Sequence, residues 1–239
     1  MKIDGDMAEL IGIHIGDGCI SRTKKYAEYY LGGDINEEIE YHDNWVAPLF
    51  NKKVMAPLLN KEVQYKKHPK VGIYGFHIFD ERIVKFFEKF GITAGSKINS
   101  RIPNNIINNK KLILRFLRGL FDTDGTIYFD KNYSAKNPKN DKPRIQVASV
   151  SKNLIDDVLN SLISFGLHPI IIGPYKGKRC KNPFYTVRLY RKSDIKFFID
   201  KIGFKNPKHL TKWEVFCRYG LCPPKTTLSQ RKNMLRKHL

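Results

Sequence analysis

The sequence predicts an α+β fold made of two similar units. A nine-residue motif that ends in Asp-Gly occurs at residues 10–18 and again at residues 117–125. Two further stretches that resemble each other, residues 74–92 and 185–204, follow the motifs, so the offset between copies drifts only from 107 to 112 residues. Such self-similarity at a fixed period indicates a duplicated structural unit. We therefore expect a first unit over residues 1–107, a second over 108–220 and a basic tail over 221–239.

Each unit is expected to begin with the apolar motif helix and to continue into β-rich segments. Alternation of apolar and polar residues predicts strands near residues 29–33, 63–67 and 71–78 in the first unit, and near 126–129, 144–150, 170–172 and 185–190 in the second.

Amphipathic helices are expected between and after these strands. Helical spacing of apolar residues places them near residues 37–51, 80–90, 153–165 and 193–202. Gly91 and Gly203 are expected to end their helices, because glycine tolerates the left-handed conformation found there. The Asn-rich segment 95–109, which contains Pro103, is expected to be a linker into the second motif helix.

The composition favours a polyanionic partner. Lys and Arg number 43 against 23 Asp and Glu, a formal net charge of +20, and a surface this basic suits nucleic acid. The most apolar region, residues 162–173, is far shorter than the ~20 residues of a spanning helix. No signal peptide is expected either, which favours an intracellular protein, cytoplasmic or organellar. Four scattered cysteines form neither a disulfide framework nor a convincing zinc spacing.

The charge is unevenly divided between the units. Residues 1–107 hold 15 basic and 14 acidic residues, a net of +1, whereas the remainder holds 28 and 9, a net of +19. The first unit even carries an acidic cluster, which we interpret as a solvated helix face. The cluster consists of Asp34, Glu37, Glu38, Glu40 and Asp43.

The two motif helices are expected to pack directly against each other. Gly12 and Gly16 lie four residues apart in the first motif, and Gly119 and Thr123 hold the matching places in the second. Small residues at this spacing let two helix backbones approach closely.

Packing of this kind would bring Asp17 and Asp124 together at the ends of the helices. Gly18 and Gly125, which follow them, are expected to adopt the left-handed conformation that ends a helix.

Two carboxylates at adjoining helix ends repel each other, and a divalent cation would relieve this repulsion. Mg²⁺ binds through one or two carboxylates together with water and substrate phosphates, and Mn²⁺ or Ca²⁺ could replace it in binding. We expect the metal site to comprise Asp17 and Asp124 with the preceding residues Gly16 and Thr123. Such a site suits metal-assisted phosphodiester hydrolysis. A single Asp-Gly could merely stop a helix, but two copies in matching contexts argue against that reading.

The two nonapeptides resemble the paired motif of the LAGLIDADG homing endonucleases, in the single-chain form with two motifs. The resemblance extends over about residues 7–216. It implies two pseudo-symmetric αββαββα units, motif helices at their interface, and antiparallel sheets that form a DNA-binding saddle. It also implies that the last acids of the motifs, Asp17 and Asp124, hold the catalytic metals, and that both strands of a long asymmetric target are cut to leave short 3′ overhangs. A monomer that needs no protein partner is expected.

The first motif departs from the family pattern in having Ile15 where the second has Asp122. The family does not use this position as a metal ligand, so we interpret Asp122 as a solvated or capping group. Thr123 is bulkier than the usual small residue at its place. His14, opposite Phe121, is interpreted as an interface or core residue.

A lysine follows the last helix of each unit at a matching place. Lys97 and Lys208 resemble the family's lysine that helps to organise the water network of the site, and Lys205 competes with Lys208 for this role. A positioned cation would stabilise the negative charge that develops in the transition state.

The outward faces of the strands are expected to read DNA, because side chains alternate between the two faces of a sheet. Arg and Gln can contact guanine and adenine in the major groove. The residues expected to face DNA from the strands are Ser21, His77, Thr126, Tyr128, Arg144, Gln146, Thr186, Arg188 and Tyr190.

Basic residues in the hairpin loops are expected to hold phosphates instead. Neutralisation of ~10 phosphates would give a slope near −9 in a plot of log K against log salt. The loop residues are Arg22, Lys24, Lys25, Lys66, Lys67, Lys131, Lys136, Lys176, Lys178 and Arg179.

The function that these features favour is a metal-dependent, site-specific double-strand DNA endonuclease, intron-encoded or free-standing rather than intein-derived. Two alternatives stay open: an RNA maturase that binds intron RNA, and a non-cleaving DNA-binding regulator on the same fold. Asp17 and Asp124 argue against the regulator, since loss of either would be the simplest sign of inactivity. The basic tail is expected to wrap DNA or to be frayed.

Overall fold

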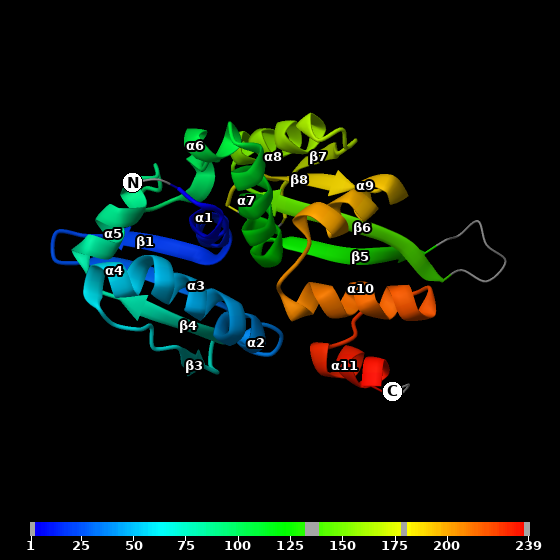
Figure 1. Cartoon of the computed structure of the whole chain (residues 1–239), viewed down its shortest axis with the longest axis horizontal. Helices are drawn as coiled ribbons and strands as arrows, with labels where there is room; N and C mark the ends of the chain where they lie inside the picture. The colour runs from blue at the N-terminus through cyan, green and yellow to red at the C-terminus, as the bar shows by residue number, and fades with distance from the viewer. Residues whose placement is uncertain (1–2, 132–138, 178–180, 237–239) are drawn as a thin grey trace.

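The computed structural model describes residues 3–131, 139–177 and 181–236, and it has the α+β fold that the sequence predicts (Figure 1). Two four-stranded antiparallel sheets are present, with strand orders β1-β2-β4-β3 and β5-β6-β8-β7. The identical order in both sheets confirms that the chain contains two copies of one αββαββα unit.

The first unit follows the predicted order of elements. Its elements are α1 (Gly5–Asp17), β1 (Gly18–Arg22), β2 (Ala27–Asp34), α2 (Ile39–Tyr41), α3 (Ala47–Phe50), α4 (Ala56–Leu59), β3 (Lys66–His68), β4 (Ile73–Ile78) and α5 (Glu81–Glu88).

The helix expected over residues 37–51 is longer than the sequence indicated. Helical turns continue from α2 to α4, with two π-helical turns, His42–Val46 and Asn51–Met55, between the α-helical parts. Each wide turn comes just before a proline, Pro48 or Pro57, whose nitrogen cannot donate a helical hydrogen bond. The strand expected at 63–67 is also displaced to residues 66–68.

The second unit has the same order, followed by two additional helices. Its elements are α7 (Lys110–Thr123), β5 (Gly125–Lys131), β6 (Asn140–Ser149), α8 (Lys152–Ser164), β7 (Ile170–Tyr175), β8 (Phe184–Leu189), α9 (Lys192–Phe197) with a π-helical turn (Phe198–Ile202), α10 (Pro207–Tyr219) and α11 (Leu228–Arg236). Gly91 and Gly203 have φ values of 78° and 66°, as expected of glycines that follow helix ends.

The segment between the units is packed and partly helical, which corrects its reading as a simple linker. It contains a short 3₁₀ turn (Lys97–Asn99) and α6 (Asn104–Ile107). Ile106 is fully buried, and the backbone carbonyl of Ser100 accepts a hydrogen bond of 2.7 Å from Ser151 in the second unit. This segment therefore helps to fix the two units together.

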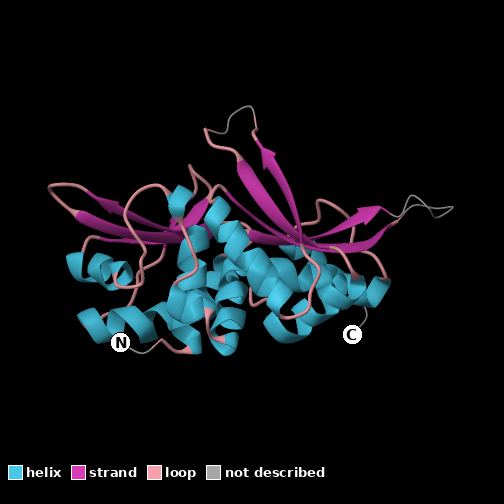
Figure 2. Ribbon diagram, turned by 90° about the horizontal axis from the view of Figure 1, so that it is seen from above, coloured by secondary structure: helices cyan, strands magenta, loops and turns pink. Residues whose placement is uncertain are grey.

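The two sheets lie on one side of the molecule and the helices lie on the other (Figure 2). The inner faces of the strands, exemplified by Ile20, Leu31, Ile127 and Val187, are buried against the helices. The outer faces are left open on the opposite side. None of the helices within the described ranges is long and apolar enough to cross a membrane.

Candidate active site at the paired motif helices

The motif helices α1 and α7 pack backbone to backbone. A Cβ atom added to Gly12 would lie 2.2 Å from the carbonyl oxygen of Phe116, and one added to Gly119 would lie 2.2 Å from that of Glu9. At Gly16 an added Cβ would lie 1.9 Å from Oγ1 of Thr123. Glycine is therefore required at these places by the closeness of the partner helix.

The glycines after the two acids have a different role from the one predicted. Gly18 has extended backbone with a φ of −80°, so it is not a left-handed helix terminus. A Cβ at Gly18 would lie 2.2 Å from Nδ1 of His14, and one at Gly125 would lie 2.3 Å from the carbonyl oxygen of Phe121. Both glycines let a strand leave the helix in close contact with the helix itself.

Asp17 and Asp124 occupy the ends of α1 and α7, and the surroundings of each carboxyl raise its pKa. Burial raises the pKa of Asp17 well above its usual range, and the negative charges of Glu38 and Asp124 raise it further. The pKa of Asp124 is also raised, although this carboxylate is more exposed, because crowding by protein limits its hydration. The structure thus places two mutually repelling carboxylates together where the helices end.

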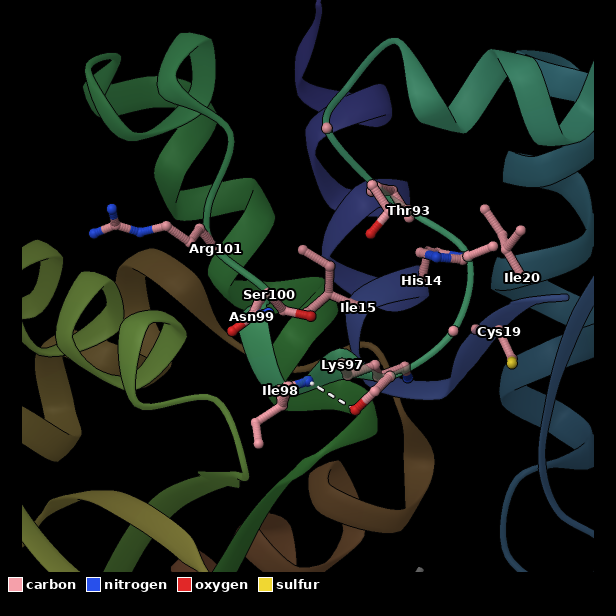
Figure 3. Close-up of a pocket in the computed structure, with 16 residues that line it drawn as sticks. His14, Ile15, Cys19, Ile20, Thr93, Lys97, Ile98, Asn99, Ser100 and Arg101 are labelled. Carbon is pink, nitrogen blue, oxygen red and sulfur yellow. Dashed lines mark hydrogen bonds between the residues drawn. The ribbon is translucent and has the colours of Figure 1, made fainter. Parts of the chain in front are cut away.

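Lys97 and Lys208 both lie close enough to the acids to act on their charge. The positive charges of these two lysines lower the pKa of Asp17 and of Asp124, against the effect of burial. Lys97 donates a hydrogen bond from Nζ to the carbonyl oxygen of Gly16, and burial lowers its own pKa. A pocket that Lys97, His14 and Cys19 help to line adjoins this place (Figure 3).

Of the two competing lysines in the second unit, the geometry favours Lys208. Its Nζ lies 3.2 Å from Oε1 of Glu38, on the side of the acid pair. Lys205 instead holds its Nζ 4.4 Å from the ring centroid of Trp45 in a cation–π contact.

Glu38 belongs to this site although the sequence placed it on a solvated face. It is only 4% exposed, and its carboxylate accepts hydrogen bonds from the Asp34 amide at 2.7 Å and from Nδ2 of Asn206 at 2.8 Å. Asn206 follows it by 168 residues, so no local pattern could have revealed the contact.

The other members of the acidic cluster are exposed or half-buried, and each has a partner. Exposed Asp43 accepts a hydrogen bond of 2.6 Å from the Tyr74 hydroxyl, and exposed Asp34 caps the following turn. Glu37 and Glu40 are half-buried and pair with Arg231 and Lys232 of the tail. The prediction of a solvated helix face is therefore wrong for Glu38, while Asp34 and Asp43 do lie at the surface.

Asp122 is buried and binds the backbone just before α10, so it is not solvated. It is fully buried and accepts hydrogen bonds of 3.0 Å from the backbone amides of Lys205 and Asn206, immediately before α10. Burial raises its pKa well above the usual range. Ile15, at the matching place in α1, is a buried core residue.

His14 is a core residue. It is 3% exposed, its ring stacks on Tyr29 and Phe87, and Nδ1 lies 3.2 Å from the Tyr29 hydroxyl. Burial lowers its pKa to about 3, so the ring is neutral.

The donor set at the acid pair fits a hard cation that keeps most of its water. No group of three or more His, Cys, Asp or Glu side chains that could share a metal exists in the described parts of the chain. Two carboxylates completed by water and phosphate are, however, the ligands that Mg²⁺ accepts. The Gly16 carbonyl is engaged by Lys97, and the Thr123 hydroxyl donates to the Gly119 carbonyl at 3.0 Å. The cysteines described, Cys19, Cys217 and Cys222, are free.

The outer face of the second sheet carries a connected group of polar side chains. Thr126, Gln146 and Arg188 are neighbours across β5, β6 and β8. Nε of Arg188 donates to Oε1 of Gln146 at 3.0 Å, and its guanidinium lies 5.7 Å from the ring centroid of Tyr128. The group is therefore pre-organised before any ligand binds.

The corresponding place in the first sheet holds a different set. Cys19, Tyr30 and His77 are neighbours across β1, β2 and β4. Nδ1 of His77 lies 2.6 Å from Oε1 of Glu28. Glu28 is an acid on this face that was not among the residues predicted to lie there.

Three of the expected DNA contacts are already engaged or covered. Thr186 is only 5% exposed. Arg22 points to the helical side, where Glu81 and Glu88 bind it at 2.7 and 2.9 Å. Arg144 pairs with Asp130 at 2.9 Å.

The other predicted contacts differ in exposure. Ser21 is half-buried and Tyr190 is 38% exposed. The exposed lysines in hairpins and edge strands are Lys24, Lys25, Lys66, Lys67, Lys131 and Lys176. Lys136, Lys178 and Arg179 lie outside the described residues.

Comparison with known proteins agrees with this geometry. Residues 111–203 match the model of the LAGLIDADG-like domain. The chain resembles a solved structure of I-DmoI in complex with DNA and Ca, with a TM-score of 0.59 and 17% identity over 85% of this chain and 93% of that one. It also resembles a variant of I-SmaMI, with a TM-score of 0.58 and 15% identity over 98% and 93% of the two chains.

Curated relatives share sequence across most of this chain. The replication factor C small subunit of Methanocaldococcus jannaschii is 25% identical over 210 residues, which cover 87% of this chain and 10% of that protein. The DNA polymerase of Thermococcus litoralis is 26% identical over 200 residues, which cover 82% and 11%. The chain thus spans about a tenth of the length of these relatives.

The fold and the two Asp-Gly motif helices resemble those of LAGLIDADG proteins. The second unit matches the LAGLIDADG-like domain over residues 111–203, and most of the chain shares its fold with I-DmoI and I-SmaMI.

Proposed function

We propose that this chain is a site-specific double-strand DNA endonuclease of the homing type. The observation that carries the proposal is the acid pair: Asp17 and Asp124 lie at the ends of two crossing motif helices, and Lys97 and Lys208 act on both. Two open sheet faces flank this centre, and they supply polar side chains suited to base edges (Figure 2). The neighbours I-DmoI and I-SmaMI have been solved bound to DNA.

A divalent metal, in our proposal Mg²⁺ with Mn²⁺ or Ca²⁺ as substitutes in binding, would supply a nucleophilic water and neutralise charge on the phosphate. I-DmoI has been solved with target DNA in the presence of Mn, Mg or Ca. In this chain Asp17 and Asp124 would hold the metal ion, and Gly16 and Thr123 would adjoin the metal site. This assignment is consistent with the raised pKa of each carboxyl, because a bound cation would offset the burial and the negative neighbouring charges that raise it.

The residues of the chain itself would position the phosphodiester and balance its charge. Lys97 and Lys208, one from each unit, would stabilise the charge that grows on the phosphate oxygens as water attacks. Because the two strands of a duplex are related by a twofold axis, each half of the centre would face one strand. We propose that cleavage of both strands leaves short 3′ overhangs.

DNA recognition would be divided between the sheets. Exposed lysines on both would hold phosphates, and the Gln146–Arg188 pair would read base edges from the second sheet. We propose that a monomer suffices, because one chain supplies both motifs. An intron-encoded gene is also part of the proposal, although similar units occur as a small part of long proteins.

The proposal is tested by cleavage of a DNA library. Randomised duplexes and intron-insertion sequences are incubated with Mg²⁺ and wild-type protein, and the cut products are sequenced. We expect one family of long asymmetric sites to be cut on both strands. A wild-type protein that binds a defined duplex yet never cuts it would contradict the proposal and favour a regulator. Stronger binding to structured intron RNA than to duplex DNA in a gel shift would favour the maturase.

A further inference from the structure

The C-terminal tail contains a helix, α11, that connects the two units, so it is not the frayed segment that was one of the two expectations. Helix α11 packs on α10 of the second unit (Figure 1). At the same time it contacts the first unit at Glu37, in the turn before α2, and at Glu40, within α2. We call α11 the strap.

Arg231 is the centre of the strap. It is fully buried, which is rare for an arginine. Its NH2 group lies 2.7 Å from Oε2 of Glu37 and 3.4 Å from the carbonyl oxygen of Lys208, and Nε donates to Oγ1 of Thr211 at 2.9 Å. NH1 donates to the carbonyl oxygen of Thr226. One guanidinium thus joins the first unit to the first turns of α10.

Glu37 is held by the strap through both carboxylate oxygens. Oε1 accepts a hydrogen bond of 2.7 Å from the amide of Leu228, the first residue of α11, while Oε2 binds Arg231. A carboxylate at a helix N-terminus is stabilised by the partial positive charge there. The position of Glu37 is therefore fixed by two charge-assisted contacts.

The residues fixed in this way adjoin the cleavage centre. Glu38 directly follows Glu37, and it binds both Asn206 and the side chain of Lys208. The segment 206–211 is consequently gripped from two sides, by Glu38 toward the acid pair and by Arg231 behind it.

Lys97 is held by a different structure. It rests on the Gly16 carbonyl of its own unit, and the α11 contacts given above all lie on the side of Lys208.

We propose that α11 positions the second half of the cleavage centre, and that Arg231 is the positioning residue through which it acts. Arg231 sets the place of Lys208 and Glu38 relative to Asp17 and Asp124, without touching DNA or the reacting phosphate. The inference rests on the proposed endonuclease function. Loss of the strap should slow cleavage of one DNA strand more than cleavage of the other.

The test uses the full chain and the duplex that wild type cuts. Arg231→Met should slow cleavage of one strand about tenfold or more, since a displacement of about 1 Å at a reacting centre can cost ~100-fold. The other strand should change less than about threefold, so nicked plasmid accumulates before linear product. DNA affinity in Ca²⁺ should be unchanged. Equal slowing of both strands would indicate a merely structural role and overturn the proposal.

Three further variants distinguish a positioning role of Arg231 from simple misfolding. Arg231→Met leaves the Glu37 charge unpaired, whereas the double variant Arg231→Met with Glu37→Gln removes both charges. The double variant should show the same strand bias, and Arg231→Lys should recover part of the rate. Lys232→Met, which breaks the more exposed pair with Glu40, is the matched control and should cut both strands as wild type does. A well-folded double variant without strand bias would overturn the proposal.

Hydrogen exchange on the free protein separates this inference from the endonuclease proposal. Arg231→Met should speed exchange of the amides in segment 206–211 and leave segment 97–101 as in Lys232→Met. That result supports positioning by the strap even if wild type cuts no DNA, in which case only the proposed function fails. Unchanged exchange in segment 206–211 would overturn the strap's role whatever the activity.

Discussion

The two lysines at the acid pair come from equivalent places in the repeat, yet the protein holds them in different ways. Lys97 reaches the Gly16 carbonyl from the segment between the units. Lys208 is placed by the start of α10 and by Glu38 of the other unit, with Arg231 behind it. Duplication has thus preserved the arrangement of chemical groups while the structures that support them have diverged.

The sheets differ in the same manner. Residues 108–239, the second unit together with its tail, carry nearly all of the net charge, and the outer face of the second sheet presents the linked pair Gln146 and Arg188. The first presents Tyr30 and His77, the latter bound to Glu28. In the first unit Arg22 is also bound by two glutamates on the helical side of the sheet, so it does not point to the outer face. We therefore expect the two units to grip DNA unequally.

The largest effect should come from the interface that both halves share. Gly12→Ala would force a Cβ to 2.2 Å from the Phe116 carbonyl oxygen, and we expect it to lower the free energy of unfolding by at least about 3 kcal/mol, since overpacking cannot relax against backbone. Gly91→Ala, at a positive φ with no atom nearby, should cost only about 1–2 kcal/mol. Urea denaturation of both variants provides the comparison. Similar losses would show that the motif helices can move apart.

Substitution of the two lysines should show that each half of the centre at the acid pair serves a different DNA strand. Lys97→Met and Lys208→Met should each slow one strand about 10- to 100-fold by loss of transition-state charge stabilisation, and the affected strands should be opposite. Single-turnover assays with each strand end-labelled measure this. The same strand affected in both variants would show that the halves do not serve separate strands.

Neutral substitution of hairpin lysines should reveal the unequal grip. Lys131→Gln with Lys176→Gln in the second unit should reduce the slope of log K against log salt by about 2 if both hold phosphates. Lys24→Gln with Lys25→Gln in the first unit should reduce it less. Affinity is measured by fluorescence anisotropy across a salt series. Equal changes would place the charge asymmetry away from the DNA surface.

The smallest effect should be a gain in stability when an acid is neutralised. The pKa of Asp17 is raised by burial and by neighbouring carboxylates, so its charged form destabilises the folded state above that pKa. Asp17→Asn should therefore be more stable than wild type at pH 7, and the gain should vanish as the pH falls toward the unfolded carboxyl's value. Mg²⁺ should stabilise wild type and not the variant. Thermal unfolding at several pH values would contradict this account if wild type were the more stable at pH 7 without metal.

Much of the fold could be predicted because it depends on local patterns. The repeat, the strand alternation and the small residues at Gly12 and Gly119 all follow from sequence spacing, and the strand orders and helix contacts agree with them. The predicted bounds of an element were wrong where local sequence rules did not hold. An example is the helix after β2, which continues through Pro48 and Pro57 by means of π-helical turns.

The parts of the site that escaped prediction depend on long-range contacts. Glu38 acquires its place from Asn206, and Glu37 from Arg231, each more than 160 residues away in sequence. An acidic run looks solvated until the basic partner that covers it is known. The burial of Thr186 likewise could not be predicted from alternation alone, which placed it among the outward residues.

The catalytic role of the acid pair is best measured by strand-resolved, single-turnover cleavage by Asp17→Asn and Asp124→Asn, each compared with wild type in Mg²⁺. Both variants should stay folded and bind the duplex with wild-type affinity in Ca²⁺ or better. Each should lose cleavage by a factor of about 1,000 or more, because a carboxylate that anchors the metal has no substitute. Near wild-type cutting of both strands by either variant would show that the paired acids are not the catalytic centre.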